Sequence, residues 1–119
     1  MTLVYAYRER GLTRDITILD ANGDAITPGA NDKVRAQLVH RGRTTALLTV
    51  SSDAATANGS SFTKSHPTST QNRLDIKPTD LTTSLVPAGV YTLAIDYYDN
   101  ASSVWRVVDR QVFGLMEDR

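Results

Sequence analysis

Cysteine is absent from this chain of 119 residues. Without a thiol there is no disulfide framework, no thiolate zinc site and no nucleophilic cysteine, so stability must come from packing. An excess of charge of one sign is missing too, because 13 basic side chains balance 13 acidic ones. The chain therefore has no general attraction for polyanions or anionic lipid, and we expect neither a nucleic-acid nor a membrane partner.

Long hydrophobic runs are also missing. The apolar run within residues 1–12 is too short for the central region of a signal peptide, and arginines interrupt it early. No other segment approaches the length of a membrane span. We therefore expect synthesis and assembly in the cytoplasm, without a cleaved signal. The length predicts one domain, covering residues 1–119.

The clearest pattern in the chain is a hairpin near its carboxyl end. From Val90 to Tyr98 large apolar residues alternate with small or polar ones, which is typical of a half-buried strand. Residues 99–103 tolerate turn geometry, and the run from Val104 to Phe113 is again rich in β-branched and aromatic residues. The inward face of the first strand is predicted to carry Tyr91, Leu93, Ile95 and Tyr97.

Shorter β-prone runs separated by turn residues precede this hairpin. They predict strands at 13–19, 33–40, 44–50 and 74–77, an edge strand or arm at 2–7, a long loop over 51–72, and one short helical turn within 78–85. About seven short strands with this spacing favour an antiparallel β-sandwich, with a closed barrel as the rival. Its core is predicted to contain Ile16, Ile18, Val34, Leu38, Tyr91, Leu93 and Ile95.

Two local details follow from the same patterns. Leu47 and Leu48 cannot both face the core from one flat strand, which predicts a bulge or a second neighbour there. In the helical turn, Thr79 or Asp80 is predicted as the cap.

Candidate catalytic and metal-binding residues are few. His40 and His66 have no serine or carboxylate nearby that completes a catalytic arrangement, so both are interpreted as structural. Asp20, Asn22 and Asp24 alternate as in the first part of a calcium loop. However, glycine falls at the fourth position of that loop and asparagine at the twelfth, so a hairpin turn is the better interpretation.

The carboxylates of the late hairpin do not favour an enzyme either. Asp96 and Asp99 lie at a strand end and a turn, with no sign of the cleft that glycoside hydrolysis requires. We therefore expect no enzymatic activity, with no catalytic residues, no cofactor and no metal.

Aromatic residues of the hairpin raise the possibility of sugar binding. Tyr97, Tyr98 and Trp105 are of the type that stacks on sugars, but packing against the core or a neighbouring subunit is the simpler interpretation. Strict alternation along 104–113 places large apolar groups on both faces, as in a strand with its own core on one side and a partner on the other. One predicted face carries Val104, Arg106, Val108, Arg110 and Val112, and the other Trp105, Val107, Asp109, Gln111 and Phe113.

Two segments resemble a known family. Residues 15–24, DITILDANGD, and residues 86–93, VPAGVYTL, are similar to the strand–turn and Pro-Ala-Gly-X-Tyr segments of small immunoglobulin-like modules in tailed-bacteriophage virion proteins, such as the amino-terminal module of the baseplate upper protein. The resemblance implies an all-β fold, an antiparallel immunoglobulin-like sandwich of about seven strands with one short helical turn. Tyr91 would then match the tyrosine corner, in which the phenol hydroxyl binds the corner backbone.

The resemblance also implies a function. Because little sequence follows Phe113, we expect a stand-alone structural component of the virion, a head decoration protein that contacts the major capsid protein in a symmetric assembly. A baseplate, neck or tail component and a carbohydrate-binding module are the alternatives. Segments 1–10 and 114–119 are predicted as assembly arms. The predicted interface residues are Leu3, Tyr5, Tyr7, Tyr98, Trp105, Phe113, Leu115 and Met116.

Overall fold

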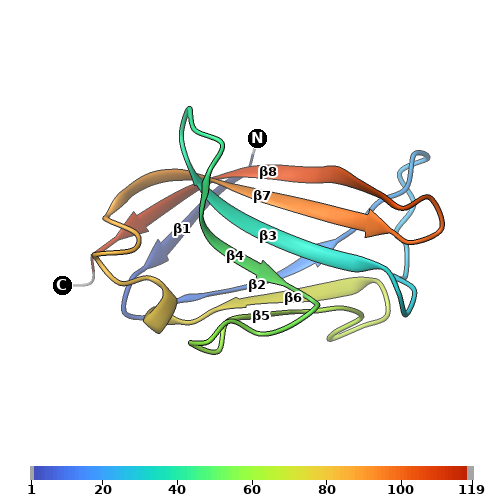
Figure 1. Cartoon of the computed structure of the whole chain (residues 1–119), viewed down its shortest axis with the longest axis horizontal. Coiled ribbons are helices and arrows are strands. Elements are labelled where there is room, and N and C mark those ends of the chain that lie inside the picture. Colours follow the sequence, from blue (N-terminus) through green and yellow to red (C-terminus); the bar gives the residue numbers. More distant parts are fainter. Residues whose placement is uncertain (1, 118–119) are drawn as a thin grey trace.

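The structure is a computed structural model that describes residues 2–117. It consists of strands joined by loops, with a single 3-10 turn (Figure 1). In chain order the elements are β1 (Thr2–Tyr7), β2 (Leu12–Thr17), β3 (Lys33–His40), β4 (Ala46–Ser51), β5 (Ser61–Thr63), β6 (Gln71–Ile76), η1 (Pro78–Asp80), β7 (Gly89–Asp99) and β8 (Val104–Met116).

The strands form two sheets that pack face to face. One sheet has five strands in the order β1-β8-β7-β3-β4, and the other has three in the order β2-β6-β5 (Figure 1). The predicted all-β sandwich is confirmed, with one more strand than expected, and the sheets do not close into a barrel. All pairings are antiparallel except that between β1 and β8, which runs in parallel from Thr2 opposite Gln111 to Tyr7 opposite Met116.

The hydrophobic core lies between the two sheets. Alternation along β3, β6 and β7 directs every second side chain inward, as the burial of these strands shows. The predicted core is confirmed: Ile16, Ile18, Val34, Leu38, Tyr91, Leu93 and Ile95 are all buried. Val4, Ala6, Phe62, Leu74, Ile76, Leu81, Val86, Phe113 and Leu115 complete it, with others from β3, β4 and β7.

The prediction of a long loop over 51–72 is partly wrong. β5 lies inside this segment and pairs with β6, which begins at Gln71. Phe62, the only large apolar residue of the segment, is buried in the core. Burial of this one side chain explains why so polar a segment contains a strand.

The predicted arms are also corrected. Residues 2–7 form an edge strand of the larger sheet, and residues 114–116 belong to the strand beside it. Val4 and Ala6 are buried, so β1 is part of the domain's own core. Met1 and residues 118–119 lie outside the described part of the chain.

The helical turn before β7 is present, but its cap differs from the prediction. Lys77 occupies the N-cap position of η1 and makes no side-chain cap hydrogen bond. The chain then crosses to β7, where the Tyr91 hydroxyl donates a hydrogen bond to the carbonyl of Pro87. Tyr91 therefore forms the predicted tyrosine corner.

Candidate functional site

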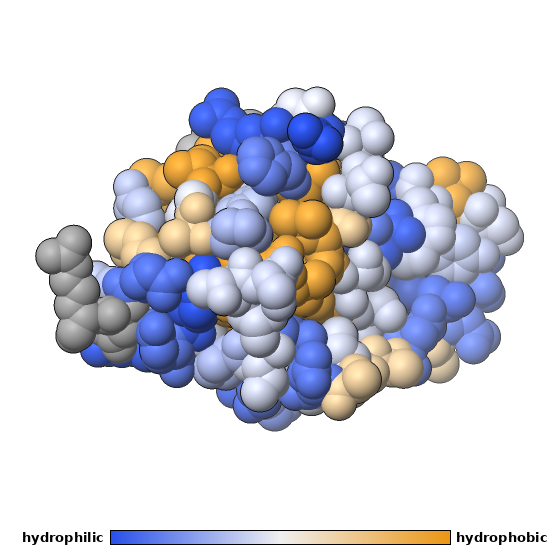
Figure 2. All heavy atoms as spheres, turned by 60° about the vertical axis from the view of Figure 1, so that its left-hand side comes forward, coloured by the Kyte–Doolittle hydropathy of each residue, from blue (hydrophilic) through white to orange (hydrophobic). Residues whose placement is uncertain are grey.

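One face of the five-stranded sheet is turned away from the three-stranded sheet, and we call it the outer face. On β1 it presents Leu3, Tyr5 and Tyr7, which are exposed, while Val4 and Ala6 between them point into the core. Figure 2 brings forward the side of the molecule on which β1 and β8 end, and shows apolar residues gathered at the surface among hydrophilic ones. Exposed apolar groups on one face of a small domain are typical of a contact surface.

Cross-strand pairing joins these residues to apolar groups on β7 and β8. The ring of Tyr5 covers Gly114, where an added Cβ atom would come within 2.9 Å of the ring. Gly114 pairs in turn with Val90, which is exposed on β7. The absence of a side chain at Gly114 therefore lets one edge of the Tyr5 ring approach the strand closely, a role that the sequence pattern did not indicate.

A β-bulge in β8 corrects the predicted faces of that strand. Ile95 pairs with Asp109 but Asp96 pairs with Val107, so Val108 is an extra residue on β8. Trp105 and Val107 therefore lie on the outer face, whereas Gln111 and Phe113 point into the core. Strict alternation had wrongly grouped these four residues together.

Trp105 is the centre of a cluster on the outer face and is 36% exposed. Its ring lies 5.3 Å from that of Tyr98, and the guanidinium of Arg35 lies over it at 4.0 Å from the ring centre. Arg35 also donates two hydrogen bonds to one carboxylate oxygen of Asp96, from Nε at 3.2 Å and from Nη2 at 2.9 Å. This is a favourable cation–π geometry. One face of the indole is therefore already covered by the Arg35 guanidinium.

A hollow of about 530 Å³ opens beside this cluster. It lies between the turn that joins β3 to β4 and the outer surface of β7 and β8. Its lining includes Gln37, Thr92 and Ala94 from the strands, together with several arginines and Trp105. Sequence reasoning did not find this hollow, because it depends on the relative position of three strands.

The predicted interface residues divide into two groups. Five of them belong to the outer face and are exposed or half-buried: Leu3, Tyr5, Tyr7, Tyr98 and Trp105. Met116 is half-buried, whereas Phe113 and Leu115 are buried in the core and are 0% and 2% exposed. The interface prediction is corrected for Phe113 and Leu115, because a side chain inside the sandwich cannot contact another protein.

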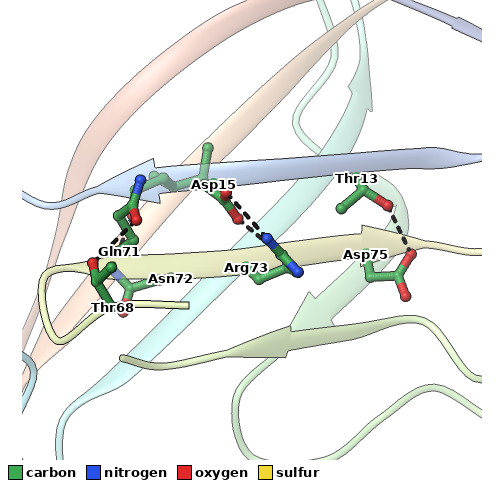
Figure 3. Close-up of polar contacts among 8 residues, drawn as sticks. Thr13, Asp15, Thr68, Gln71, Asn72, Arg73 and Asp75 are labelled. Carbon is green, nitrogen blue, oxygen red and sulfur yellow. Dashed lines mark hydrogen bonds and ion pairs between the residues drawn. The ribbon is translucent and has the colours of Figure 1, made fainter. Parts of the chain in front are cut away.

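The opposite surface, on the three-stranded sheet, has a different character. Arg73 on β6 points toward Asp15 on β2, with its Nε 2.9 Å from one carboxylate oxygen (Figure 3). Its hydrogen bond holds the pKa of Asp15 below the ordinary value and raises the pKa of Arg73. Thr13 and Asp75 form a further polar contact across the same two strands. Charges on this surface are already paired with each other, and the outer face is therefore the better candidate for a contact surface.

The residues considered for catalysis have structural partners. The rings of His40 and Tyr91 pack in a T-shaped arrangement, with 5.3 Å between their centres. The backbone of His66 donates a hydrogen bond to the Gln71 carbonyl. Asp99 accepts hydrogen bonds from Ala101 and Ser102 within the β7–β8 turn. Within residues 2–117 the structure brings neither histidine into a hydrogen bond with a serine or a carboxylate.

The candidate calcium loop is a turn, as predicted. One carboxylate oxygen of Asp20 accepts hydrogen bonds from the backbone of Asn22 at 2.8 Å and of Asp24 at 3.0 Å. Among the described residues no three His, Asp or Glu side chains lie where they could hold a metal ion together. Over the same residues no helix is both long enough and apolar enough to cross a membrane.

Arg8 and Asp80 are buried charged side chains whose contacts the sequence did not indicate. Arg8 donates hydrogen bonds to the carbonyls of Leu81 and Val86 and forms an ion pair with Glu117 at 2.9 Å. Asp80 accepts hydrogen bonds from Thr56 and Asn58. These contacts hold loops against the end of the sandwich, so both residues stabilise the fold.

Asp80 also has a perturbed acidity. Burial acts to raise the pKa of its carboxyl group, but hydrogen bonds from Ser60, Thr56 and Asn58 favour the charged form more strongly and lower it. The result is a carboxylate that remains ionised although it is buried. Asp80 faces loop residues and not an open cavity, which is consistent with a structural role.

Comparison with known proteins identifies the class of fold. No protein-family model and no curated protein matches the sequence. Among solved structures, a marsupial T cell receptor matches 100% of this chain at a TM-score of 0.59 and 13% sequence identity, and the chain spans 51% of that receptor chain. At this identity the likeness concerns the fold alone. The protein is an immunoglobulin-like β-sandwich.

Proposed function

We propose that this chain is a non-enzymatic structural component of a tailed-phage virion, a decoration protein that binds the major capsid protein through its outer face. The observation that carries this proposal is the set of apolar side chains exposed on that face, on β1, β7 and β8: Leu3, Tyr5, Tyr7, Val90, Trp105 and Val107. They lie on three neighbouring strands of one sheet, an arrangement that suits contact with another protein. The similarity of residues 15–24 and 86–93 to phage virion modules supports the choice of partner.

Decoration of this kind would act through binding energy alone. Each copy would bury its outer face against shell subunits and so raise the barrier to rupture of the shell. A rigid sandwich suits this role because little conformational entropy is lost when it binds. The symmetry of a shell would multiply a modest local gain over many copies.

The direct test is to locate the protein in purified particles of the phage that encodes it, by mass spectrometry and cryo-electron microscopy. We expect many copies in contact with the capsid shell, with β1 and β8 toward it. Absence from particles, or attachment only at a baseplate, neck or tail, would contradict head decoration. Attachment at the tail would favour the alternative of an adaptor protein.

A matched pair of variants tests the surface itself. Leu3→Glu places a carboxylate in the proposed contact, on β1 and outside the lining of the hollow, and it should weaken binding to undecorated heads by about tenfold or more, because an unpaired buried charge costs several kcal/mol. Thr17→Glu introduces the same side chain at an exposed position on β2, on the other sheet, and should bind normally. Equal binding by the two variants would mean that another surface makes the contact.

A carbohydrate-binding module is the second candidate, since Trp105 is partly exposed beside a hollow. Its weakness is that Arg35 already covers one face of the indole, where a sugar would stack. Saturable binding on a glycan array that Trp105→Ala abolishes would favour this candidate over decoration.

A further inference from the structure

The hollow on the outer face has the size of a specific binding site. Its volume of about 530 Å³ lies within the range of pockets that enclose small ligands or single side chains of a partner. Thr92 and Ala94, which are small, lie on β7 between the β3–β4 turn and β8. Their size leaves room between the turn on one side and Trp105 and Arg110 on the other.

The charge of the lining is strongly one-sided. Arg35, Arg43 and Arg110 line the hollow, and Asp96 is its only acidic lining residue. Arg106 lines it too, and its guanidinium donates a hydrogen bond to the carbonyl of Leu19 at 2.9 Å. Four guanidinium groups against one carboxylate leave the hollow positive, although the whole chain has no net charge.

Two of these arginines are available for a ligand. Within residues 2–117, the guanidinium groups of Arg43 and Arg110 make no hydrogen bond or ion pair. Arg35 is held in place by Asp96 and by the Trp105 ring. The hollow thus combines one positioned guanidinium with two free ones, a donor arrangement that suits carboxylates, which accept paired N–H groups from arginine.

We propose that this hollow receives an acidic segment of the partner protein, whose Asp or Glu side chains pair with Arg43 and Arg110 and approach the edge of the Arg35–Trp105 cluster. The inference rests on the proposed function, since the segment would belong to the protein that binds the outer face. Charge complementarity supports an acidic peptide as the occupant, and the surrounding exposed apolar groups, Val107 among them, suit a protein surface.

Other anions fit the hollow less well. A sugar acid would find one face of Trp105 covered by Arg35. A nucleic acid strand requires a basic track along several phosphates, whereas the arginines here converge on one hollow in a chain without net charge. Both are nevertheless included in the test as competing ligands.

Trp105 provides the measurement, because it is the single tryptophan of the chain and lines the hollow. The full chain would be titrated with a capped oligoglutamate peptide, and binding followed by tryptophan fluorescence and by isothermal calorimetry. An oligoglutamine peptide, a sulfated disaccharide and a single-stranded oligonucleotide would be titrated in parallel. We expect saturable binding of oligoglutamate below about 1 mM, weakened by added salt, and weaker or no binding of the others.

Three variants of matched chemistry locate the site. Arg43→Gln and Arg110→Gln should each weaken oligoglutamate binding about tenfold, as expected for loss of a charged hydrogen bond. Arg41→Gln is the control, because Arg41 lies on the same turn as Arg43 but outside the lining. It should bind nearly as well as the natural chain. Circular dichroism would show that all three remain folded.

The inference is wrong if oligoglutamate does not bind, if Arg43→Gln and Arg110→Gln bind it as well as Arg41→Gln does, or if the oligonucleotide or disaccharide binds more tightly. Binding of the variants to undecorated phage heads tests the acidic-peptide site and the decoration function separately. If Leu3→Glu, which lies outside the lining of the hollow, fails to decorate heads while Arg43→Gln and Arg110→Gln decorate normally, the hollow is not used and the decoration function stands. If the chain is absent from particles yet the peptide data hold, decoration fails and the acidic-peptide site remains.

Discussion

Tyr91 shows how one side chain stabilises a crossing between the two sheets. Its ring is buried in the core and packs against His40, while its hydroxyl donates a hydrogen bond to the Pro87 carbonyl just before β7. Burial raises the pKa of the phenol, so the hydroxyl keeps its proton and remains a donor. The contact fixes the direction in which the chain enters the longest hairpin of the domain.

Removing this hydroxyl should destabilise the fold measurably. Tyr91→Phe keeps the ring but leaves the Pro87 carbonyl without this donor, so we expect a loss of about 0.5–1.5 kcal/mol in the free energy of unfolding. Tyr5→Phe is the matched control, because Tyr5 is 59% exposed and should change the stability little. Urea denaturation of the two variants gives the comparison, and equal stabilities would refute a role for the corner hydrogen bond.

Asp32 links three segments of the chain through its carboxylate. Oδ2 accepts hydrogen bonds from the Tyr97 hydroxyl at 2.6 Å and from the backbone of Gly29 at 2.7 Å, and Oδ1 accepts one from the backbone of Asn100 at 2.9 Å. These bonds, that from Tyr97 first, lower the pKa of Asp32 from its ordinary 3.8. Lys64 donates to the backbone carbonyl of Asp32, which adds a nearby positive charge.

The lowered pKa predicts a dependence of stability on acid. Because the folded pKa of Asp32 lies below the unfolded one, its contribution is present in full above about pH 4 to 5 and is lost as the pH falls through the folded pKa. Asp32→Asn should therefore reduce the fall in unfolding free energy below pH 4. Asp24→Asn, at an exposed turn position, is the control and should retain the full slope. Identical slopes for the natural chain and Asp32→Asn would contradict this assignment.

At the scale of elements, β1 and β8 decide what the outer face presents. β1 pairs with a strand about a hundred positions away, and its alternation places Val4 and Ala6 inside and three larger residues outside. The bulge at Val108 then shifts the alternation of β8, so that Trp105 joins the outer face while Phe113 stays in the core. Both features direct large apolar groups to the same exposed surface.

Removing β1 tests whether this strand belongs to the domain. A chain without residues 1–7 loses the buried Val4 and Ala6 and the ladder along residues 111–116. We expect a lower melting temperature and faster hydrogen exchange at the amides of this ladder that point toward β1, because they lose their partners while the others still face β7. An arm that served only for assembly would leave both measurements of the isolated chain unchanged.

At the scale of the whole molecule, the two sheets share one core, but their solvent-facing surfaces differ in composition. The surface of the three-stranded sheet carries paired charges, as between Asp15 and Arg73. The outer face of the five-stranded sheet carries exposed apolar groups and arginines without partners among the described residues. The interior is contributed by both sheets and by the segment before β7. This asymmetry supports the proposal that the outer face is the side that binds a partner.

Leu93 tests the packing of that shared core. It is fully buried on β7, so Leu93→Ala should lower the free energy of unfolding by about 2–5 kcal/mol through lost contacts and the cavity left behind. Val90→Ala removes an exposed side chain from the same strand and should cost far less. An unchanged melting temperature in Leu93→Ala would mean that the core is placed wrongly.

Local patterns were sufficient for much of this architecture. Alternation alone located β3 with both its ends, the inward residues of β7 and the strands of the last hairpin. A strand that is buried on one side carries an apolar residue at every second position, and this pattern is visible in the sequence. Turn chemistry located the Asp20–Asp24 turn, since an aspartate that accepts backbone hydrogen bonds favours it locally. The tyrosine corner, in contrast, was implied by the resemblance of residues 86–93 to known modules, and the hydrogen bond from the Tyr91 hydroxyl to Pro87 is present.

Only the tertiary structure decided which faces are exposed and what lies beside them. The sequence could not show that β1 pairs in parallel with β8, that one extra residue at Val108 reverses the alternation, or that Phe62 makes a strand of a polar segment. It could not reveal the hollow, whose arginines come from β3, β8 and the β3–β4 turn. Each of these features depends on contacts between residues far apart in the chain, and such contacts leave no local periodicity from which to predict them.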